Sequence, residues 1–306
     1  MKAYVIHENP DWYPPFAAAF EAEGVDHEPW LLGDGLLDLD AAPPPGVYWS
    51  RMSASAHTRG HPLAKDHTRA VLSWLEAHGR RVVNGRSVLE LEMSKAAQHT
   101  ALRAAGIEVP RTVAVVGPGG LLKAAAAFPG PFITKHNQGG KGLGVALFES
   151  VDALAEHLAG PDHQPPVDGI TLVQEYLRAA EPRITRVEVV DGEVVYALTA
   201  DTARGGFELC PADACAVGGG PAAPSLFALR AGFDHPVLKQ YLDFAARHRV
   251  EVAGFEFIET VDGRLVTYDV NTNTNYNPEV DAAAPRSGPR QVARLLKRLI
   301  EEEGNR

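Results

Sequence analysis

Two carboxylates near the C-terminal end of the chain are the residues best placed to do chemistry. Glu256 and Asp269 each stand inside an apolar run, and Asp262-Gly263 between them predicts a hairpin turn. Such a hairpin brings the carboxylates together, where an apolar setting requires a cation to neutralise them. The Asn271 amide oxygen, on the same face as Asp269, completes an oxygen set that suits Mg²⁺. The alternative is two surface carboxylates on an edge strand.

A lysine followed by a glycine-rich loop is the second candidate, within residues 131–145. Backbone N–H groups of such a loop can approach phosphate because glycine lacks a β-carbon, while lysine supplies positive charge. The spacing is not that of a Walker-type loop, because no hydroxyl residue follows Lys141. Nor does the loop open a long helix, as a dinucleotide fingerprint does. A flexible hairpin loop is the alternative. The candidate residues are Lys135, Gly139, Gly140, Lys141, Gly142 and Gly144.

The third candidate is the apolar run at residues 172–177, which ends in polar residues. An extended segment of this kind can offer backbone donors and acceptors to an adenine edge, with apolar side chains above and below the ring. The alternative is a buried strand end followed by solvated charges.

The elements that must position these residues follow from hydrophobic periodicity. In the first third, alternating strands and helices predict a mostly parallel sheet. Its strands are expected at residues 3–7, 27–32, 46–52 and 81–84, and its helices at 14–23 and 63–78, with Gly24 as a left-handed cap. Further on we expect a helix at 87–105, short strands and helices over 107–185, strand-like runs at 187–199, 252–258 and 265–270, and a closing helix at 289–303.

Composition excludes several classes of protein. The 306 residues are 45% hydrophobic and 22% charged, as in folded domains, and the net charge of −10 argues against nucleic acid or an anionic membrane as a partner. Neither a signal peptide nor a long apolar span is visible. The two cysteines, Cys210 and Cys215, do not form a disulfide framework or a zinc site, so a cytoplasmic location is expected.

Along the chain the lysine with its glycine-rich loop comes first, the run at 172–177 second and the carboxylate hairpin last, and in that order they resemble the ATP-grasp superfamily over about residues 86–300. Within it, the chain is most similar to the ribosomal-protein glutamate ligase and glutathione synthetase branch, because Thr185-Arg186-Val187 precedes an Asp191-Gly192-Glu193 hairpin. The resemblance implies an α/β ATP-grasp fold with an N-terminal Rossmann-like βα domain at residues 1–86. It further implies a central and small subdomain at 87–184 and a large C-terminal subdomain at 185–306.

The resemblance also implies cofactors and residue roles. ATP and one or two Mg²⁺ are expected, with Mn²⁺ as an alternative ion. The residues expected to contact phosphate are Lys95, Lys135, Lys141 and the loop glycines, and those expected to contact adenine are Gln174, Glu175, Tyr176 and Leu177. The expected metal ligands are Glu256, Asp269 and Asn271. Arg186 and Arg204 are expected to bind the acyl phosphate or a carboxylate.

Three positions depart from that branch. Glu256 and Asp269 exchange the usual order of the two acidic ligands, and Ile184 replaces an acidic residue, which leaves Glu181 as the stand-in for a ribose contact. After Asn271, residues 272–278 replace the usual Pro-Gly, so a different acceptor side is expected.

The activity implied by the resemblance is ATP-dependent joining of a carboxylate to an amine through an acyl phosphate, with a glutamate-like amino acid as substrate. The acceptor is a small molecule, a peptide or a protein, and a homodimer is a family-level expectation. A small-molecule kinase and a nucleotide-binding protein without turnover are the alternatives. The sequence leaves the role of two further segments undecided. Arg51, His57, Arg59 and His61 form either a carboxylate site or a solvated loop, and residues 207–215 could line the acceptor site.

Overall fold

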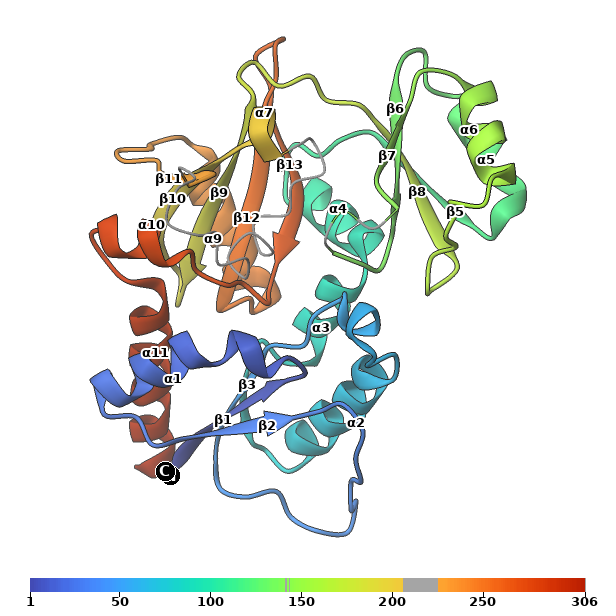
Figure 1. Ribbon diagram of the computed structural model, residues 1–306. Coiled ribbons are helices and arrows are strands. Elements are labelled where there is room, and N and C mark those ends of the chain that lie inside the picture. The colour runs from blue at the N-terminus through green and yellow to red at the C-terminus, as the bar shows by residue number, and fades with distance from the viewer. Residues whose placement is uncertain (141, 143, 206–224, 306) are drawn as a thin grey trace.

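Three β-sheets organise the molecule, as the computed structural model in Figure 1 shows. The structure describes residues 1–140, 142, 144–205 and 225–305. Lys141 and the segment 207–215, both named above, therefore lie outside the described residues.

The N-terminal sheet has the order β2-β1-β3-β4, and its paired strands are all parallel, which confirms the predicted parallel sheet. Gly24 ends the first helix with φ +69°, the left-handed conformation that glycine adopts without strain. The elements are β1 (Lys2–His7), β2 (His27–Leu31), β3 (Gly46–Ser50), β4 (Arg81–Val83), α1 (Pro14–Glu23), α2 (Ala64–Ala77) and the 3-10 turns Pro10–Trp12 and Ala56–Arg59.

Two short helices lead from this unit into a four-stranded antiparallel sheet of order β5-β8-β6-β7. Figure 1 shows α5 (Leu121–Ala125) and α6 (Val151–Ala159) on one face of that sheet. The connecting helices are α3 (Arg86–Met93) and α4 (Lys95–Ala104). The sheet unit contains β5 (Thr112–Val116), β6 (Phe132–His136), β7 (Ala146–Phe148), β8 (Ile170–Glu175), α5 (Leu121–Ala125), α6 (Val151–Ala159) and the 3-10 turn Pro118–Gly120.

The third sheet has five strands in the order β11-β10-β9-β12-β13, all antiparallel. Its last pair is the predicted hairpin, and Glu256 lies opposite Asp269 in the register. The elements are β9 (Arg183–Val190), β10 (Glu193–Asp201), β11 (Phe227–Leu229), β12 (Val252–Glu259), β13 (Leu265–Asn271), α7 (Thr202–Gly205), α9 (Val237–His248), α10 (Pro278–Ala283) and α11 (Gly288–Gly304).

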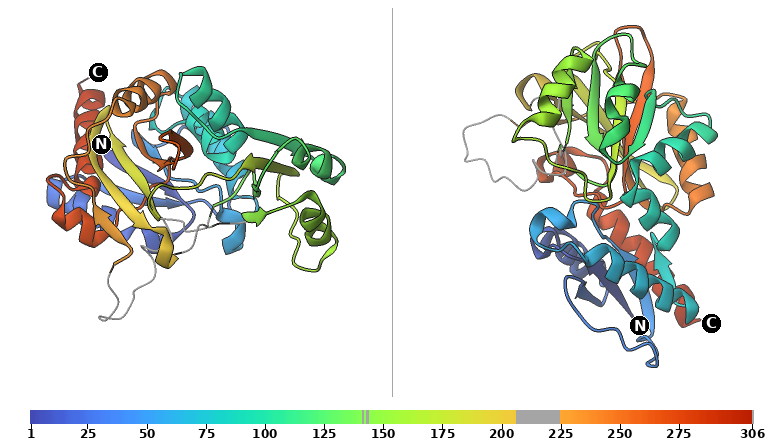
Figure 2. Two further views of the ribbon diagram at one scale, coloured as in Figure 1. Left: turned by 90° about the horizontal axis from the view of Figure 1, so that it is seen from above. Right: turned by 90° about the vertical axis from the view of Figure 1, so that its right-hand side faces the viewer.

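The closing helix α11 joins the first and third sheets. Its apolar face, including Val292 and Leu296, packs into one core with Phe16 and Trp49 of the N-terminal unit and Leu198 of β10. In Figure 2 the N-terminal unit and α11 lie together at one end of the molecule, with the antiparallel sheets beyond them. The C-terminal helix thus fixes the N-terminal unit against the sheet that carries the carboxylates.

Two predicted elements were wrong in their boundaries. The helix expected at 87–105 is interrupted at Ser94, whose φ of −142° is extended and whose hydroxyl caps α4 by accepting from the Ala97 N–H. The strand expected at 187–199 is two strands, because Asp191 and Gly192 both adopt positive φ and form the turn that the resemblance indicated. Helices α9 and α10 and strand β11 were not predicted.

Among the helices in the described part of the chain, none combines the length and the apolar composition needed to cross a membrane.

Candidate active site

The carboxylates Glu256 and Asp269 lie side by side on β12 and β13, and each has a cationic partner. Lys95 Nζ donates to Asp269 Oδ1 at 2.6 Å, and Arg186 Nη1 donates to Glu256 Oε1 at 3.2 Å. The Tyr268 hydroxyl donates to the other Glu256 oxygen at 2.9 Å. The paired strands therefore concentrate two acids and two cations at one point of the sheet.

Burial and charge shift the pKa values of this group in opposite directions. Burial raises the pKa of Glu256 to about 7, against the opposing effect of Arg186. At Asp269 burial favours the neutral acid, but the positive charges of Lys95 and Lys135 together outweigh it and lower the pKa. Burial likewise disfavours the charged form of Lys95, yet Asp269 raises the pKa of this lysine. A divalent cation at Glu256 would favour its ionised form and so lower this pKa.

Helix α4 holds the open edge of β13, which would otherwise expose unpaired backbone groups. The Gln98 side-chain amide donates to Val270 O at 2.8 Å, and its Oε1 accepts from Val270 N at 3.0 Å. The next residue, His99, lies 3.0 Å through Nε2 from Tyr268 O. These contacts on either side of Asp269 fix its backbone, and Gln98 and His99 were not predicted as site residues.

Lys135 reaches the same point from β6 in the other antiparallel sheet. Its side chain is 6% exposed, and Nζ lies 3.5 Å from Tyr268 O. Burial, followed by repulsion from Lys95, lowers the Lys135 pKa to about 7. An anion bound between Lys95 and Lys135 would relieve this repulsion, as expected for lysines that contact phosphate.

The glycine loop leaves the end of β6 through two anchored residues. Asn137 Oδ1 accepts from Ala96 N at 2.8 Å at the start of α4, and Asn137 Nδ2 donates to Asp168 at 2.6 Å. A β-carbon on Gly144, whose φ is +66°, would stand 2.1 Å from the His136 ring, so this position requires glycine. Gly139, Gly140 and Gly142 line the cavity described below.

The N-terminal unit contacts this loop directly. Lys65 Nζ, near the start of α2, donates to Gln138 Oε1 at 2.8 Å. Gln138 Nε2 in turn lies 3.4 Å from Ala54 O, and the Gly140 α-carbon faces Ser55. The position of the glycine loop therefore depends on a unit far away in sequence.

A mainly apolar cavity of about 210 Å³ lies between the two antiparallel sheets. One wall is formed by Gln174, Glu175, Tyr176 and Leu177 at the end of β8, and Lys95, Lys135, Glu256 and Asp269 stand at its polar end. Within the described residues, the buried Gln174 Oε1 has no hydrogen-bond partner. An apolar slot with one unsatisfied acceptor fits a heteroaromatic ring that carries an amino group.

A smaller cavity of about 50 Å³ adjoins the slot on the side of the N-terminal unit. Asn271, Glu256 and Asp269 line it together with Ser53 and Ser55. Glu92 closes it by accepting from Thr272 N at 2.8 Å and from Ala54 N at 3.3 Å. Sequence reasoning gave Glu92 no role, although a glutamate alternating with leucines in a helix is a visible signal.

Arg186 is 1% exposed and belongs to a buried network rather than to the cavity surface. Its Nε lies 2.7 Å from Glu188 Oε1, and Thr274 Oγ1 bonds both Arg186 and Glu188. A β-carbon on Gly254 would collide with the guanidinium, so this glycine makes room for it. Glu188 was missed, although it lies two residues from Arg186 on the same strand face.

Three sets of predicted residues lie away from the cavities. Glu181 is exposed and pairs with Arg183, which lines the slot, whereas Glu181 itself is not among the lining residues. Arg204 is exposed on α7 and lies 3.4 Å from Ser225 O, outside the slot lining. Of the two alternatives given for Arg51, His57, Arg59 and His61, the solvated loop is wrong for the two arginines. Arg51 is 1% exposed and holds Asn275 and Thr274 O, and Arg59 pairs with Glu8.

The residues present fit a magnesium nucleotide. The slot supplies apolar walls and an unsatisfied acceptor, two lysines reach its polar end, and Glu256, Asp269 and Asn271 supply oxygen ligands of the kind that Mg²⁺ binds. Within the described ranges, no group of three or more His, Cys, Asp or Glu side chains is arranged to hold a metal. The candidate site has two carboxylates and one amide, so it would need oxygen atoms from a ligand or water to complete its shell.

Comparison with known protein families gives a match at the centre of the chain. Residues 93–212 match the family described as RimK-like ATP-grasp domain. A curated relative from Xanthomonas euvesicatoria, described as "Probable alpha-L-glutamate ligase", is 32% identical over 142 residues. That match covers 45% of this chain and 46% of the relative, so the chain spans about half the length of the curated relatives it matches.

Solved structures match over nearly the whole chain. The RimK domain ATP-grasp protein from Sphaerobacter thermophilus has a TM-score of 0.66 at 18% identity, covering 97% of this chain and 99% of that one. The ATP-grasp ligase PsnB, in complex with a minimal precursor, has a TM-score of 0.67 at 17% identity over 97% and 99%. PsnB has also been solved with this precursor, Mg and ADP (TM-score 0.66, 16% identity, 97% and 96%). These likenesses establish the fold.

Proposed function

We propose that this chain, which carries a RimK-like ATP-grasp domain, is an ATP-dependent carboxylate–amine ligase. One observation carries the proposal: Glu256 and Asp269 lie together at the polar end of an apolar slot that the buried Lys135 and the partly buried Lys95 also enter. Phosphoryl transfer depends chiefly on positioning and charge neutralisation, and this arrangement offers both.

Each residue has a role in the proposed mechanism. Gln174 and the backbone of 174–177 would hold the adenine, while Lys95, Lys135 and the loop glycines would hold the phosphates. Glu256, Asp269 and Asn271 would bind Mg²⁺, which when bound neutralises phosphate charge and orients the transferred group. Arg186 would act as a positioning residue, because it holds Glu256 from behind the cavity. Lys141 is proposed to cover the phosphates, from the resemblance alone.

The substrate carboxylate would sit in the small cavity lined by Ser53, Ser55 and Asn271. There it faces the polar end of the slot, where attack on the γ-phosphorus gives ADP and an acyl phosphate. An amine then displaces the phosphate and forms an amide. Closure of the glycine loop, which Lys65 and Gln138 connect to the N-terminal unit, would keep water from the acyl phosphate.

An amino acid or peptide is the substrate class that we propose. A matched relative is described as a glutamate ligase, and PsnB was solved with a precursor peptide. The number of metal ions and the replacement of Mg²⁺ by Mn²⁺ remain parts of the proposal, as do the ribose contact of Glu181, the acyl-phosphate contact of Arg204 and a homodimer.

The test is ADP release from Mg-ATP with a panel of amino acids and short peptides, singly and in pairs. Pair-dependent ADP release with formation of an amide product is expected. In Asp269→Asn the rate should fall about 10²–10³-fold, because a charged ligand at the transferring phosphate is lost. The matched control is Asp243→Asn, an exposed aspartate on α9, which should keep the wild-type rate. A phosphorylated product instead of an amide would identify a kinase and overturn the proposal.

A further inference from the structure

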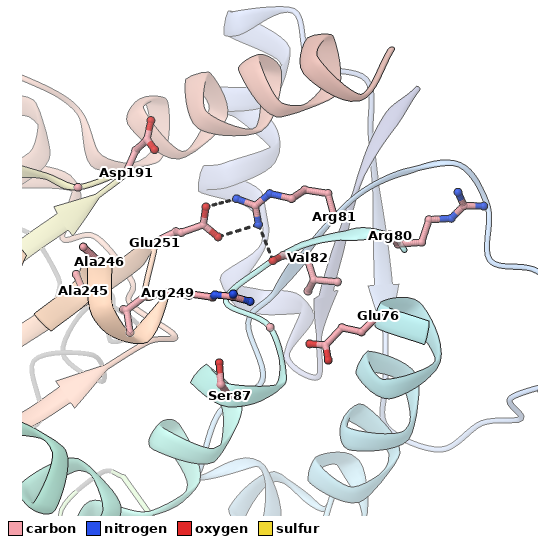
Figure 3. A pocket seen from close by; sticks show the side chains of 13 residues that line it. Glu76, Arg80, Arg81, Val82, Ser87, Asp191, Ala245, Ala246, Arg249 and Glu251 are labelled. Carbon is pink, nitrogen blue, oxygen red and sulfur yellow. Dashed lines mark hydrogen bonds and ion pairs between the residues drawn. The ribbon is translucent and has the colours of Figure 1, made fainter. Parts of the chain in front are cut away.

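A cavity larger than the two described above lies outside the candidate active site. It measures about 650 Å³ and shares no lining residue with the slot. Figure 3 shows its walls: the end of α2 and strand β4 of the N-terminal unit, the start of α3, and the end of α9. A volume of this size is in the range of small-molecule sites.

The charged groups on the cavity wall have hydrogen-bond or ion-pair partners, Arg249 excepted; Arg80 has no ion pair among the described residues, but its Nη2 donates to Pro43 O at 2.6 Å. Arg81 forms a two-pronged ion pair with Glu251, and Asp191 accepts from Arg298 through both oxygens at 2.8 Å. Glu76 Oε1 accepts from Arg86 N at 3.0 Å. Within residues 1–140, 144–205 and 225–305, the Arg249 guanidinium has no hydrogen-bond or ion-pair partner. Figure 3 shows it extended from the end of α9 toward the segment that joins β4 to α3.

The backbone at Arg249 is unusual for its residue type. It ends α9 in the left-handed conformation, with φ +57° and ψ +37°, where glycine is the usual residue. The other described non-glycine residues with positive φ are Asn84 and Asp191, both of types that tolerate it. A cation at this end of a helix interacts favourably with the helix dipole, which offsets part of the strain of the left-handed backbone.

We infer that this cavity binds a small molecule through a carboxylate or phosphate group held by Arg249. A guanidinium forms two parallel hydrogen bonds with either group. Ser87, at the start of α3, lies on the facing wall as a further donor. The cavity carboxylates are already engaged by other donors, so they leave the Arg249 guanidinium available.

The test uses pyrophosphate and citrate as probes, titrated calorimetrically at constant ionic strength without Mg²⁺. At least one probe should bind wild-type protein at millimolar concentration or below, and the stronger of the two identifies the preferred group. Arg249→Gly should weaken that binding about tenfold or more, since a charge-assisted pair is lost. The control Arg247→Gln removes a positive charge two residues away, outside the cavity lining, and should bind as wild type does.

Arg249→Gly also reports on folding, because glycine suits the left-handed position. Its melting temperature should rise by about 1–3 °C while binding is lost, which separates a lost ligand contact from a damaged fold. Absence of binding to wild type contradicts the inference. So does binding that Arg249→Gly leaves unchanged, because the probe then occupies another site such as the nucleotide slot.

Discussion

The ion pairs behind the active site and those around the large cavity contain the same residue types in very different surroundings. The side chains of Arg186 and Glu188 are 1% and 0% exposed, whereas those of Arg81 and Glu251 are 30% and 20% exposed. Charge interactions are strong where water is excluded and weak where it is not. The comparison indicates that the first network holds the catalytic sheet in shape, while the second leaves an arginine available for a ligand.

The largest expected effect tests this contrast directly. Arg186→Met leaves Glu188 and Glu256 buried without their cation, and it should lower the free energy of unfolding by about 3–5 kcal/mol. Arg81→Met removes one partner of the partly exposed pair and should lower the free energy of unfolding by about 0–1 kcal/mol. Urea unfolding of both variants measures the difference. Equal losses would show that burial does not distinguish the two networks.

An intermediate effect comes from a buried histidine beside the catalytic strand. Burial, reinforced by Lys135, lowers the His99 pKa to about 3, far below the ordinary value of 6.5. Between these values the unfolded chain binds a proton that the folded protein does not, so stability falls as pH decreases through 6.5. From pH 8 to pH 5.5 this group alone should remove about 1.4 kcal/mol.

His99→Gln checks that expectation, because glutamine keeps a donor for Tyr268 O and does not titrate. Its urea midpoint should depend less on pH than that of wild type over this range. His78→Gln, on an exposed histidine at the end of α2, is the control and should keep the wild-type dependence. If His99→Gln showed the full pH dependence, another group would be responsible for it.

The smallest effect belongs to the contact between the N-terminal unit and the glycine loop. Lys65→Met removes one hydrogen bond to Gln138, worth about 1 kcal/mol, and should raise the KM for ATP about fivefold if the loop covers the phosphates. Steady-state kinetics at varied ATP concentration measures this KM. Lys65→Arg should restore most of the affinity, and Lys123→Met, on α5 away from this contact, should have no effect. An unchanged KM for ATP in Lys65→Met would show that the contact between Lys65 and the glycine loop does not affect ATP binding.

Much of the fold follows from local sequence patterns, because alternation, caps and turn residues act over short distances. The Asp262-Gly263 turn between two apolar runs predicted the hairpin. Glu256 lies opposite Asp269 because the register shifts by one residue at a β-bulge between Glu256 and Phe257, which the sequence pattern did not predict. The break at Ser94 was missed because serine is tolerated inside helices and marks a cap only in context. Helix α9 was missed despite an apolar face that includes Tyr241 and Phe244.

The partners of the site residues could not be predicted in the same way. Lys95 and Asp269 are separated by 174 positions, and Gln138 and Lys65 by 73. No local pattern links such residues, because their contact depends on how whole sheets and helices pack. The same holds for Arg51, whose sequence neighbours suggested a solvated loop while its contacts bury it against the segment after Asn271.

The sequence by itself determined the carboxylate hairpin, the lysine with its glycine loop and the parallel N-terminal sheet, since each is written in residues close together along the chain. Only the tertiary structure decided which charges are buried, that Arg186 lies behind the cavity, and that Arg249 faces a second cavity without a partner among the described residues. The reason is physical: burial and electrostatic pairing are properties of packed surfaces, and distant segments supply those surfaces.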